Sequence, residues 1–325
     1  MLRQSLRITR SLHEIPHESL SMSPLKLNGL VAATHTPFHQ DGSLNLAIVE
    51  KQAEHLLRNG VSTAFIGGST GESHSLNVDE RLALTTRWME VARGTNIRVV
   101  VHVGSNCLTD AATLAGHAEQ SGAAAVAALS PSYFKPKNVE TLVACAKQIA
   151  SAAPRTPFYF YDIPILTGVS LSMPDFLAQG REVIPNLAGL KFTNPDLMAY
   201  QCCLRANHGA FDVPWGCDEI LLAALALGAT GAVGSTYNFA APIYNRVLAA
   251  HAAGNLQAAR DEQFRAVQMI QILVRYGFIG ATKSVMTMLG VDVGPARLPH
   301  PPISAEQSRG LRSDLESIGF FDWLK

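Results

Sequence analysis

The stretch LAGLKFT, residues 187–193, is a short apolar run that carries a single lysine, Lys191. Stretches with helical periodicity lie on both sides of it, at residues 174–179 and 195–206. A short apolar run between two helices is typical of a parallel strand that is buried on both faces. The stretch therefore predicts one strand of an α/β fold.

The same alternation of strand and helix runs through most of the chain. Strand-like runs are at residues 30–34, 63–67, 98–103, 124–129, 158–161, 188–192, 211–215 and 232–235. Helical stretches between them are at residues 46–58, 78–92, 111–120, 139–150, 174–179, 195–206 and 219–227. Eight strands favour a closed (β/α)8 TIM barrel over a doubly wound open sheet, which usually has fewer units.

Three more helical stretches follow the eighth strand, at residues 242–252, 256–274 and 279–289, before a proline-rich turn. We expect these helices to pack outside the barrel or at a subunit contact. Residues 27–240 are therefore predicted to form the barrel, and residues 241–325 additional C-terminal helices of the same domain. The length of 325 residues suits this division, because such a barrel typically needs about 250 residues.

The first 26 residues differ in composition from the rest. They contain three arginines and scattered serines, and no apolar run long enough for a secretory signal. A transit peptide is an alternative, but Glu14 and Glu18 disfavour it. We expect a disordered extension, or a true start of translation at Met22.

The charges of the chain balance, with 26 Lys and Arg against 26 Asp and Glu. Because no basic stripe stands out, neither nucleic acid nor a membrane surface is an expected partner. No apolar run approaches the roughly 20 residues that span a bilayer. The five cysteines form no C-x-x-C pair, so we expect no disulfide framework and no metal site, and free thiols favour the cytoplasm.

Lys191 and Tyr161 are the residues with the clearest chemistry. Burial on a strand disfavours the lysine ammonium and favours the neutral amine, which is the nucleophile. Tyr161 ends the strand at residues 158–161, and a phenol at the barrel mouth suits proton transfer. The non-catalytic alternatives are that Lys191 lies at the barrel rim and reaches solvent, and that Tyr161 is an aromatic residue of the core. Tyr159 lies on the same face of the strand as Tyr161, so it could be mistaken for it.

Two glycine-rich stretches attract attention. The first, GGSTGES at residues 67–73, follows a strand, so its N–H groups and the hydroxyls of Ser69 and Thr70 can hold a carboxylate or phosphate. A plain glycine turn is the alternative, and no lysine completes a nucleotide-binding P-loop. The second, at residues 228–234, has the glycine spacing of a dinucleotide-binding turn but lies between a helix and a strand, which is the inverted order.

Seven strings in the expected order carry a family resemblance: GLVAATHTPF (29–38), GGSTGES (67–73), VVVHVGS (99–105), FYFYDIPILTGV (158–169), GLKFTNPDL (189–197), WGCDE (215–219) and GATGAVGSTYN (228–238). Over residues 27–299 the chain resembles the N-acetylneuraminate lyase branch of the dihydrodipicolinate synthase superfamily. The resemblance implies a TIM barrel that cleaves N-acetylneuraminate reversibly to N-acetylmannosamine and pyruvate. It also implies that no cofactor is needed.

The resemblance assigns roles to residues. It implies that Lys191 forms a Schiff base with the 2-oxo group, that Tyr161 moves the proton, and that Ser69 and Thr70 hold the substrate carboxylate. It further implies a homotetramer, with an aromatic residue after the fourth strand near a neighbouring subunit's site. Contacts with the sugar-derived chain are implied for Thr193, Gly216, Asp218, Glu219 and Ser235.

Asp218 and Glu219 could instead have only a structural role, because carboxylates stabilise the positive start of a helix. Three positions depart from the family pattern: Asp162 follows the tyrosine, His35 is near the end of the first strand, and Cys217 lies in the sugar-contacting stretch. We expect the carboxylate of Asp162 to disfavour ionisation of its neighbour.

Three alternative functions stay open at this point. A sister aldolase would act on another 2-oxo sugar acid with the same lysine chemistry. Dihydrodipicolinate synthase is disfavoured, because the arginine usual shortly after the tyrosine is replaced by Ile165, Leu166 and Thr167. A barrel that only binds a 2-oxo acid is the non-enzymatic alternative.

Overall fold

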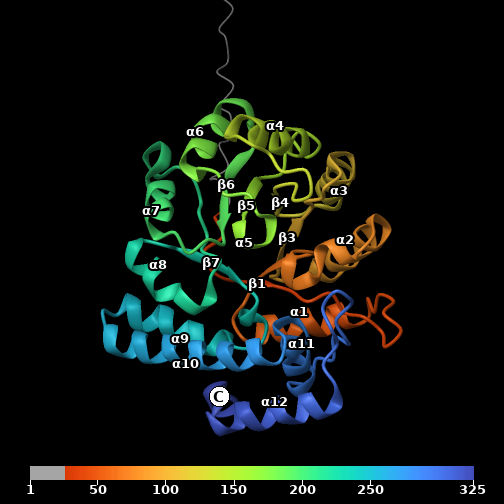
Figure 1. Ribbon diagram of the computed structural model, residues 1–325, viewed down its shortest axis with the longest axis vertical. Coiled ribbons are helices and arrows are strands. Elements are labelled where there is room, and N and C mark those ends of the chain that lie inside the picture. Colours follow the sequence, from red (N-terminus) through yellow and green to blue (C-terminus); the bar gives the residue numbers. More distant parts are fainter. Residues whose placement is uncertain (1–25) are drawn as a thin grey trace, which may run out of the picture.

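The computed structural model describes residues 26–325, so the predicted extension lies almost wholly outside the described residues. Seven parallel strands form one sheet in the order β6-β5-β4-β3-β2-β1-β7, and Figure 1 shows them at the centre of the molecule. Each predicted strand but one lies within one residue of its observed bounds. The strands are β1 Gly29–Ala33, β2 Thr63–Ile66, β3 Arg98–His102, β4 Ala125–Leu129, β5 Phe158–Asp162, β6 Leu187–Phe192 and β7 Gly231–Gly234.

The eighth predicted strand, residues 211–215, is present only as isolated bridges between β6 and β7. Its backbone still bonds on both sides: the Phe192 N–H donates to the Pro214 carbonyl at 3.0 Å, and the Trp215 N–H donates to the Gly231 carbonyl at 2.9 Å. Pro214 has no N–H to donate, which explains why a regular ladder does not form. The ring of strands is thus closed by an irregular segment, and the (β/α)8 barrel is confirmed.

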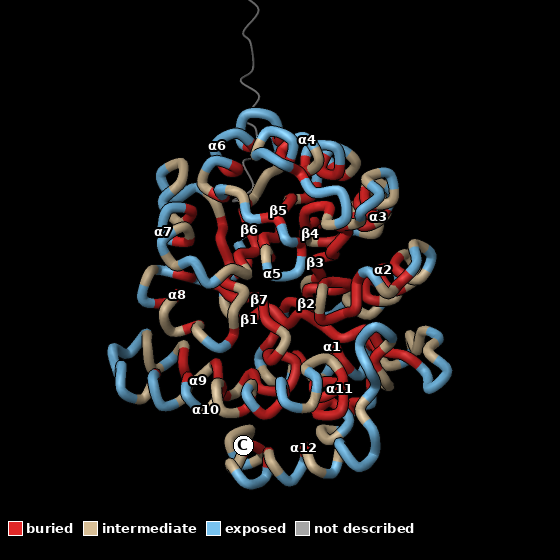
Figure 2. The backbone as a smooth tube through the Cα atoms, in the orientation of Figure 1, coloured by how far each residue is buried: buried red, intermediate tan, exposed pale blue. Residues whose placement is uncertain are grey.

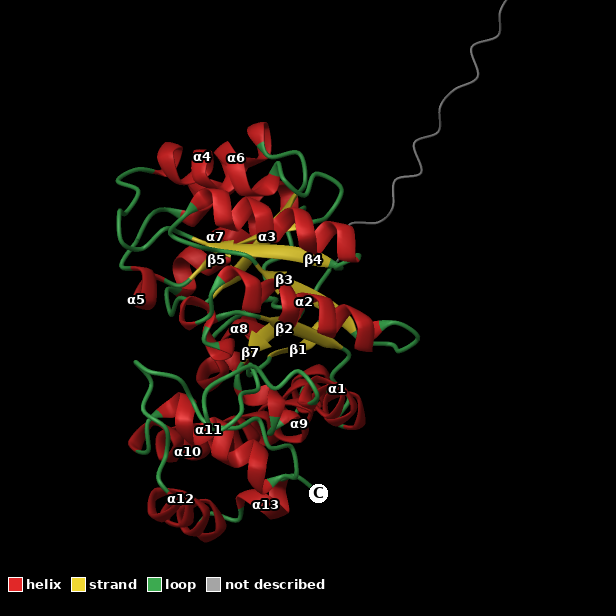
Figure 3. Ribbon diagram, turned by 90° about the vertical axis from the view of Figure 1, so that its right-hand side faces the viewer, coloured by secondary structure: helices red, strands yellow, loops and turns green. Residues whose placement is uncertain are grey.

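Helices surround the strands, and α9 to α12 lie together on one side of the barrel (Figures 1 and 3). Those predicted from the sequence lie within four residues of their observed bounds. They are α1 Ile48–Arg58, α2 Val78–Ala92, α3 Leu108–Ser121, α4 Val139–Ala150, α6 Met173–Val183, α7 Leu197–Arg205, α8 Leu221–Leu227, α9 Ala241–Ala252, α10 Leu256–Arg275 and α11 Phe278–Met288. Three were not predicted: α5 Pro164–Thr167, α12 Ala305–Ser317 and α13 Phe320–Trp323.

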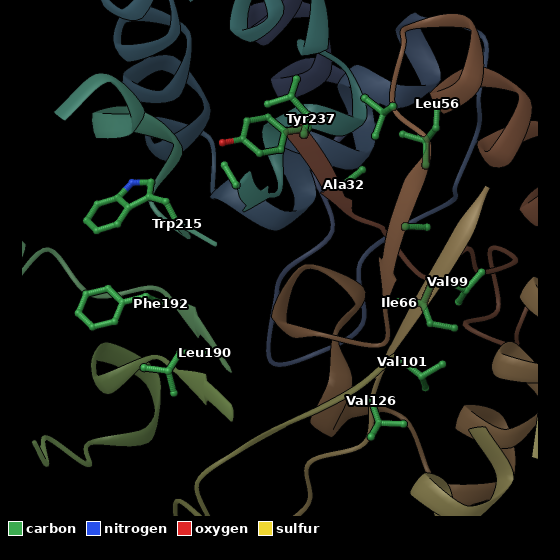
Figure 4. Close-up of a cluster of buried hydrophobic side chains, with 14 of the residues drawn as sticks. Ala32, Leu56, Ile66, Val99, Val101, Val126, Leu190, Phe192, Trp215 and Tyr237 are labelled. Carbon is green, nitrogen blue, oxygen red and sulfur yellow. The ribbon is translucent and has the colours of Figure 1, made fainter. Parts of the chain in front are cut away.

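The core is split by the barrel wall into two clusters. In β5, Tyr159 and Tyr161 point inward with Phe65 and Val100, because successive side chains of a strand alternate between its faces. The larger cluster lies between strands and helices, and Figure 4 shows part of it, with Phe192 and Trp215 among the labelled side chains. Figure 2 shows the resulting pattern, in which the strands are buried and the outer faces of the helices are exposed.

Candidate functional site

A cavity of about 740 Å³ opens at the carboxyl ends of the strands, which is where TIM barrels place their active sites. All nine predicted site residues line it. They are Lys191, Tyr161, Ser69, Thr70, Thr193, Gly216, Asp218, Glu219 and Ser235. The structure therefore brings together residues from five separate stretches of the chain.

Lys191 lies in β6 between Leu190 and Phe192, whose side chains are in the outer core. Alternation therefore turns the lysine into the barrel, where it is only 4% exposed. Its Nζ lies 3.9 Å from the ring centre of Tyr161 and 4.2 Å from that of Phe65. The buried amine thus lies between two aromatic rings and lines the cavity.

Tyr161 is the Cα partner of Lys191 across the β5–β6 ladder. Its hydroxyl lies 3.4 Å from Ser69 Oγ, which connects it to the turn after β2. Tyr159 is two residues earlier on the same face, and its hydroxyl donates to Asp212 at 2.8 Å. Burial, followed by Asp212, raises the pKa of Tyr159 far above its usual value.

The turn after β2 carries the hydroxyl pair. Gly67 has a φ of +64°, in the left-handed region that favours glycine, and a Cβ at Gly68 would collide with the Phe65 ring. Thr70 Oγ1 lies 2.6 Å from Ser235 Oγ, which follows β7. The hydroxyls of Ser69, Thr70 and Ser235 therefore line the same cavity as Lys191, and such donors suit an anionic group.

The two predicted carboxylates differ in their surroundings. Asp218 is buried, and its Oδ2 accepts bonds from the Thr236 N–H at 2.9 Å and from Thr236 Oγ1 at 2.6 Å. Burial raises the pKa of Asp218 to about 6. Glu219 is exposed at the cavity rim. Asp218 thus fixes the segment after β7 through Oδ2, while its buried Oδ1 has no hydrogen-bond partner within residues 26–325.

Thr193 and Gly216 form a matched pair on the cavity wall. The Gly216 N–H donates to the Phe192 carbonyl at 2.8 Å, which brings its Cα against Thr193. A Cβ at Gly216 would overlap Thr193 Oγ1, so this close approach requires glycine. Thr193 Oγ1 is buried and has no hydrogen-bond partner within residues 26–325, which leaves it available to a ligand hydroxyl.

The three departures from the family pattern point away from the reacting centre. Asp162 lies on the outer face of β5, where it accepts a bond from Asn194 Nδ2 at 3.1 Å and where burial raises its pKa to about 6. His35 Nε2 lies 3.0 Å from Thr282 Oγ1, and burial lowers the pKa of His35 to about 3. Burial raises the pKa of Cys217 to about 12, so its thiol is not an activated nucleophile.

The C-terminal helices contribute a wall that the sequence interpretation missed. Ile270, Val274 and Phe278 line the cavity, together with Ile279 and Pro299. Ile270 and Val274 lie four residues apart in α10 and so share one face, a signal that was present in the sequence, while Phe278 begins α11. These helices do pack outside the barrel, as expected, but they also complete its mouth.

The second glycine stretch, residues 228–234, follows α8 and contains β7, so it leads from a helix into a strand and not from a strand into a helix. Across residues 26–325, no group of three or more His, Cys, Asp or Glu side chains is arranged to hold a metal ion. None of the helices found there combines the length and apolar character needed to cross a membrane.

The fold and the site define a TIM-barrel enzyme with a buried lysine at the centre of its pocket. The chain belongs to the dihydrodipicolinate synthetase family, which it matches over residues 26–318. It is 40% identical to the N-acetylneuraminate lyase of Gallus gallus over 297 residues, which make up 90% of this chain and 96% of the relative.

Solved structures give the same family relationship. The N-acetylneuraminate lyase of Proteus mirabilis superimposes with a TM-score of 0.89 at 39% identity, covering 91% of this chain and 100% of that one. The N-acetylneuraminate lyase (sialic acid aldolase) of Aliivibrio salmonicida gives 0.88 at 40% identity, covering 91% and 98%.

Proposed function

We propose that this chain is a Schiff-base-forming lyase that cleaves N-acetylneuraminate reversibly to N-acetylmannosamine and pyruvate. The observation that carries the proposal is the meeting of Lys191, Tyr161 and the hydroxyls of Ser69 and Thr70 in one buried pocket. The relatives that share the fold at about 40% identity bear the name of this activity.

The reaction begins with the amine of Lys191. The neutral amine attacks the ketone carbon of the open-chain sugar acid, and loss of water leaves an imine. Protonation makes this imine an electron sink, which is why the reaction needs no metal and no organic cofactor. The hydroxyls of Ser69 and Thr70 hold the neighbouring carboxylate and so orient the ketone toward the lysine.

Carbon–carbon cleavage follows. Tyr161, together with the substrate carboxylate, takes the proton from the hydroxyl on the carbon that will become the aldehyde. The electrons of the breaking bond move into the imine, giving N-acetylmannosamine and an enamine on Lys191. Protonation of the enamine carbon and hydrolysis then release pyruvate and restore the amine.

Specificity for a sugar acid would come from the wall of the cavity beyond the lysine. We propose that Thr193, Gly216, Glu219 and Ser235 contact the hydroxyl-bearing chain, and that Asp218 shapes the same wall. Carboxylates suit this task because each oxygen accepts hydrogen bonds from hydroxyl groups. A sister aldolase would share the lysine chemistry and differ along this wall.

Trapping with borohydride tests the chemistry directly. Borohydride added together with pyruvate should inactivate the protein and leave one reduced adduct on the peptide that contains Lys191. Lys191→Ala should lose both the label and the cleavage activity. Lys283 is the internal comparison, because it is also a buried lysine but is engaged by Glu72 at 2.6 Å and by the Pro295 carbonyl at 2.8 Å.

An adduct on Lys283, or none, would contradict the Schiff-base mechanism and favour a barrel that only binds 2-oxo acids.

If Lys191 is labelled, a panel of aldehyde acceptors incubated with pyruvate separates the possible lyases. N-acetylmannosamine as the best acceptor supports the proposal, and another sugar aldehyde supports a sister aldolase. Aspartate semialdehyde as the best acceptor would support dihydrodipicolinate synthesis, which lacks its usual arginine at Ile165, Leu166 and Thr167.

We also propose that the protein works as a cytoplasmic homotetramer. Tyr133 and Phe134, which follow β4, are 78% and 85% exposed, and Ile165, which follows β5, is 86% exposed. Adjacent parallel strands end at the same edge, so these apolar side chains belong to one rim of the barrel mouth. Light scattering should give a mass four times that of the chain, and a monomer at micromolar concentration would contradict the tetramer.

A further inference from the structure

His102 is a buried side chain that the proposed reaction leaves without a role. It is the last residue of β3, it points into the barrel, and it is 2% exposed. Its ring meets the Tyr161 ring edge-on, with centroids 5.8 Å apart and planes at 90°. Its centroid is also 6.1 Å from that of Phe65, which borders Lys191.

The hydrogen bonds of His102 fix its tautomer. Nδ1 lies 3.0 Å from the Gly67 carbonyl, which can only accept, so Nδ1 carries the hydrogen. Ser73 Oγ is 3.2 Å from the same nitrogen. Gly67 and Ser73 are the two ends of the GGSTGES stretch, so one imidazole nitrogen holds both ends of the turn that carries the hydroxyl pair.

The imidazole is held neutral and immobile. Burial, and next the charge of Arg81, lower the pKa of His102 well below its usual value. Arg81 also donates to the His102 carbonyl at 2.8 Å and to the Gly104 carbonyl at 2.9 Å, which fixes the end of β3 from outside the barrel. A neutral ring in a fixed position is suited to holding neighbours and not to exchanging protons.

We propose that His102 is a positioning residue, which fixes the carboxylate-binding turn relative to Tyr161 by bonding to the turn and packing against the Tyr161 ring. The inference rests on the proposed function and adds a residue to it. The two halves of the site come from β2 and β5, which are not neighbours in the sheet, and β3 separates β2 from β4. His102 bridges this gap inside the barrel.

Two substitutions separate the contacts of the imidazole. His102→Asn keeps a donor near the Nδ1 position, so the turn should hold and KM should stay within about threefold of the original value. It removes the ring against Tyr161, so kcat should fall about tenfold. His102→Leu removes the donor as well and leaves the Gly67 carbonyl unpaired. Its KM for N-acetylneuraminate should therefore be about tenfold higher than that of His102→Asn.

His35→Leu is the matched control. His35 is equally buried and neutral, but it faces Thr282 on α11 and not the pocket. The His35→Leu substitution should lower the melting temperature and leave KM and kcat unchanged. His102→Gln is the second comparison, because its longer side chain places the amide near Nε2, so its KM should exceed that of His102→Asn even if His102→Leu does not fold.

The pH profile and the trapping reaction complete the test. The acid side of the kcat/KM profile should be the same for the original protein and His102→Asn, and a shift would show proton transfer by His102 and overturn the positioning role. Equal KM values for the Asn and Gln variants would also overturn it. Absence of a borohydride-trapped pyruvate adduct on Lys191 in the unmodified protein would instead reject the proposed function.

Discussion

At the scale of single residues, Asp218 and Glu219 look equivalent in the sequence but not in the structure. Both are carboxylates in the WGCDE string, and the resemblance implies sugar contacts for both. The partner that separates them, Thr236, lies 18 positions further along the chain. The sequence could predict that this string enters the site, but it could not predict that one oxygen of Asp218 is bonded to Thr236.

Glu219→Gln should therefore weaken sugar cleavage selectively. Loss of a charge-assisted hydrogen bond costs about 1.5–3 kcal/mol, or roughly tenfold to a hundredfold in kcat/KM. Borohydride trapping of pyruvate on Lys191 should be unaffected, since the carboxylate-binding hydroxyls are separate. Glu316→Gln on α12 is the exposed control, and kinetics unchanged by Glu219→Gln would remove the sugar role of this residue.

Asp218→Asn should change stability more than specificity. Its folded pKa of about 6 exceeds the usual 3.8, so between these values the folded state keeps a proton that the unfolded state has lost. Stability from this group therefore falls as pH rises from about 4 to 6, by on the order of 3 kcal/mol. Asn still accepts from Thr236, and urea unfolding of the variant should lack this loss. The same pH slope in both proteins would contradict it.

At the scale of secondary-structure elements, predictions worked where local signals agree. The bounds of α2 were predicted correctly from helical periodicity, and Asn77 and Glu80 form a capping box that fixes its start. The segment at residues 211–215 was predicted as a regular strand, but Pro214 interrupts its ladder. The helix α12 was missed although Ser304 and Gln307 form the same capping box, since its surface is largely polar.

The link between the turn after β2 and α11 could not be predicted from the sequence. Glu72 Oε1 lies 2.6 Å from Lys283 Nζ, with both side chains almost fully buried, and its Oε2 accepts from the Arg297 N–H at 2.6 Å. The two partners are more than 200 residues apart, so no local pattern pairs them. This ion pair ties the turn that carries Ser69 and Thr70 to the C-terminal helices.

Lys283→Met should lower stability by about 3–5 kcal/mol, because it leaves the Glu72 carboxylate buried without its cation. Burial lowers the pKa of Lys283 to about 8, so between pH 8 and 10.5 the unfolded state binds a proton that the folded state lacks. Stability from this group rises with pH in that window, and the variant should lack the rise. Denaturant unfolding at pH 7.5 and 9.5 measures both effects.

The exposed pair between Lys325 and Asp322 gives the matched control for this experiment. Lys325→Met should change stability by less than about 1 kcal/mol at either pH, because exposed ion pairs contribute little. If Lys283→Met behaves in the same way, the buried pair does not hold the turn against α11.

At the scale of the whole molecule, the barrel is closed at its amino end by residues that the motifs do not include. Leu27 is buried, and its N–H donates to Asp212 Oδ2 at 2.7 Å. Asp212 also accepts from the Tyr159 hydroxyl, so one carboxylate joins the segment before β1 to β5 and to the closing segment. The repeat pattern predicted a closed ring of strands. It could not predict this closure of the amino end by Leu27 and Asp212, which depends on contacts between residues far apart in the sequence.

The composition of the first 26 residues predicts a disordered extension, so a chain that starts at Met22 should keep the melting temperature and turnover of the full protein. A chain that starts at Gly29 is the contrasting variant. It loses a buried leucine, which contributes about 1.5–3 kcal/mol, and a donor to the buried carboxylate of Asp212. Its melting temperature should fall by several degrees, since about 1 kcal/mol corresponds to roughly 2–4 °C in a domain of this size. Thermal unfolding of the three proteins measures both differences. A drop of more than a few degrees on starting at Met22 would show that earlier residues stabilise the barrel, and the extension would then be part of the fold.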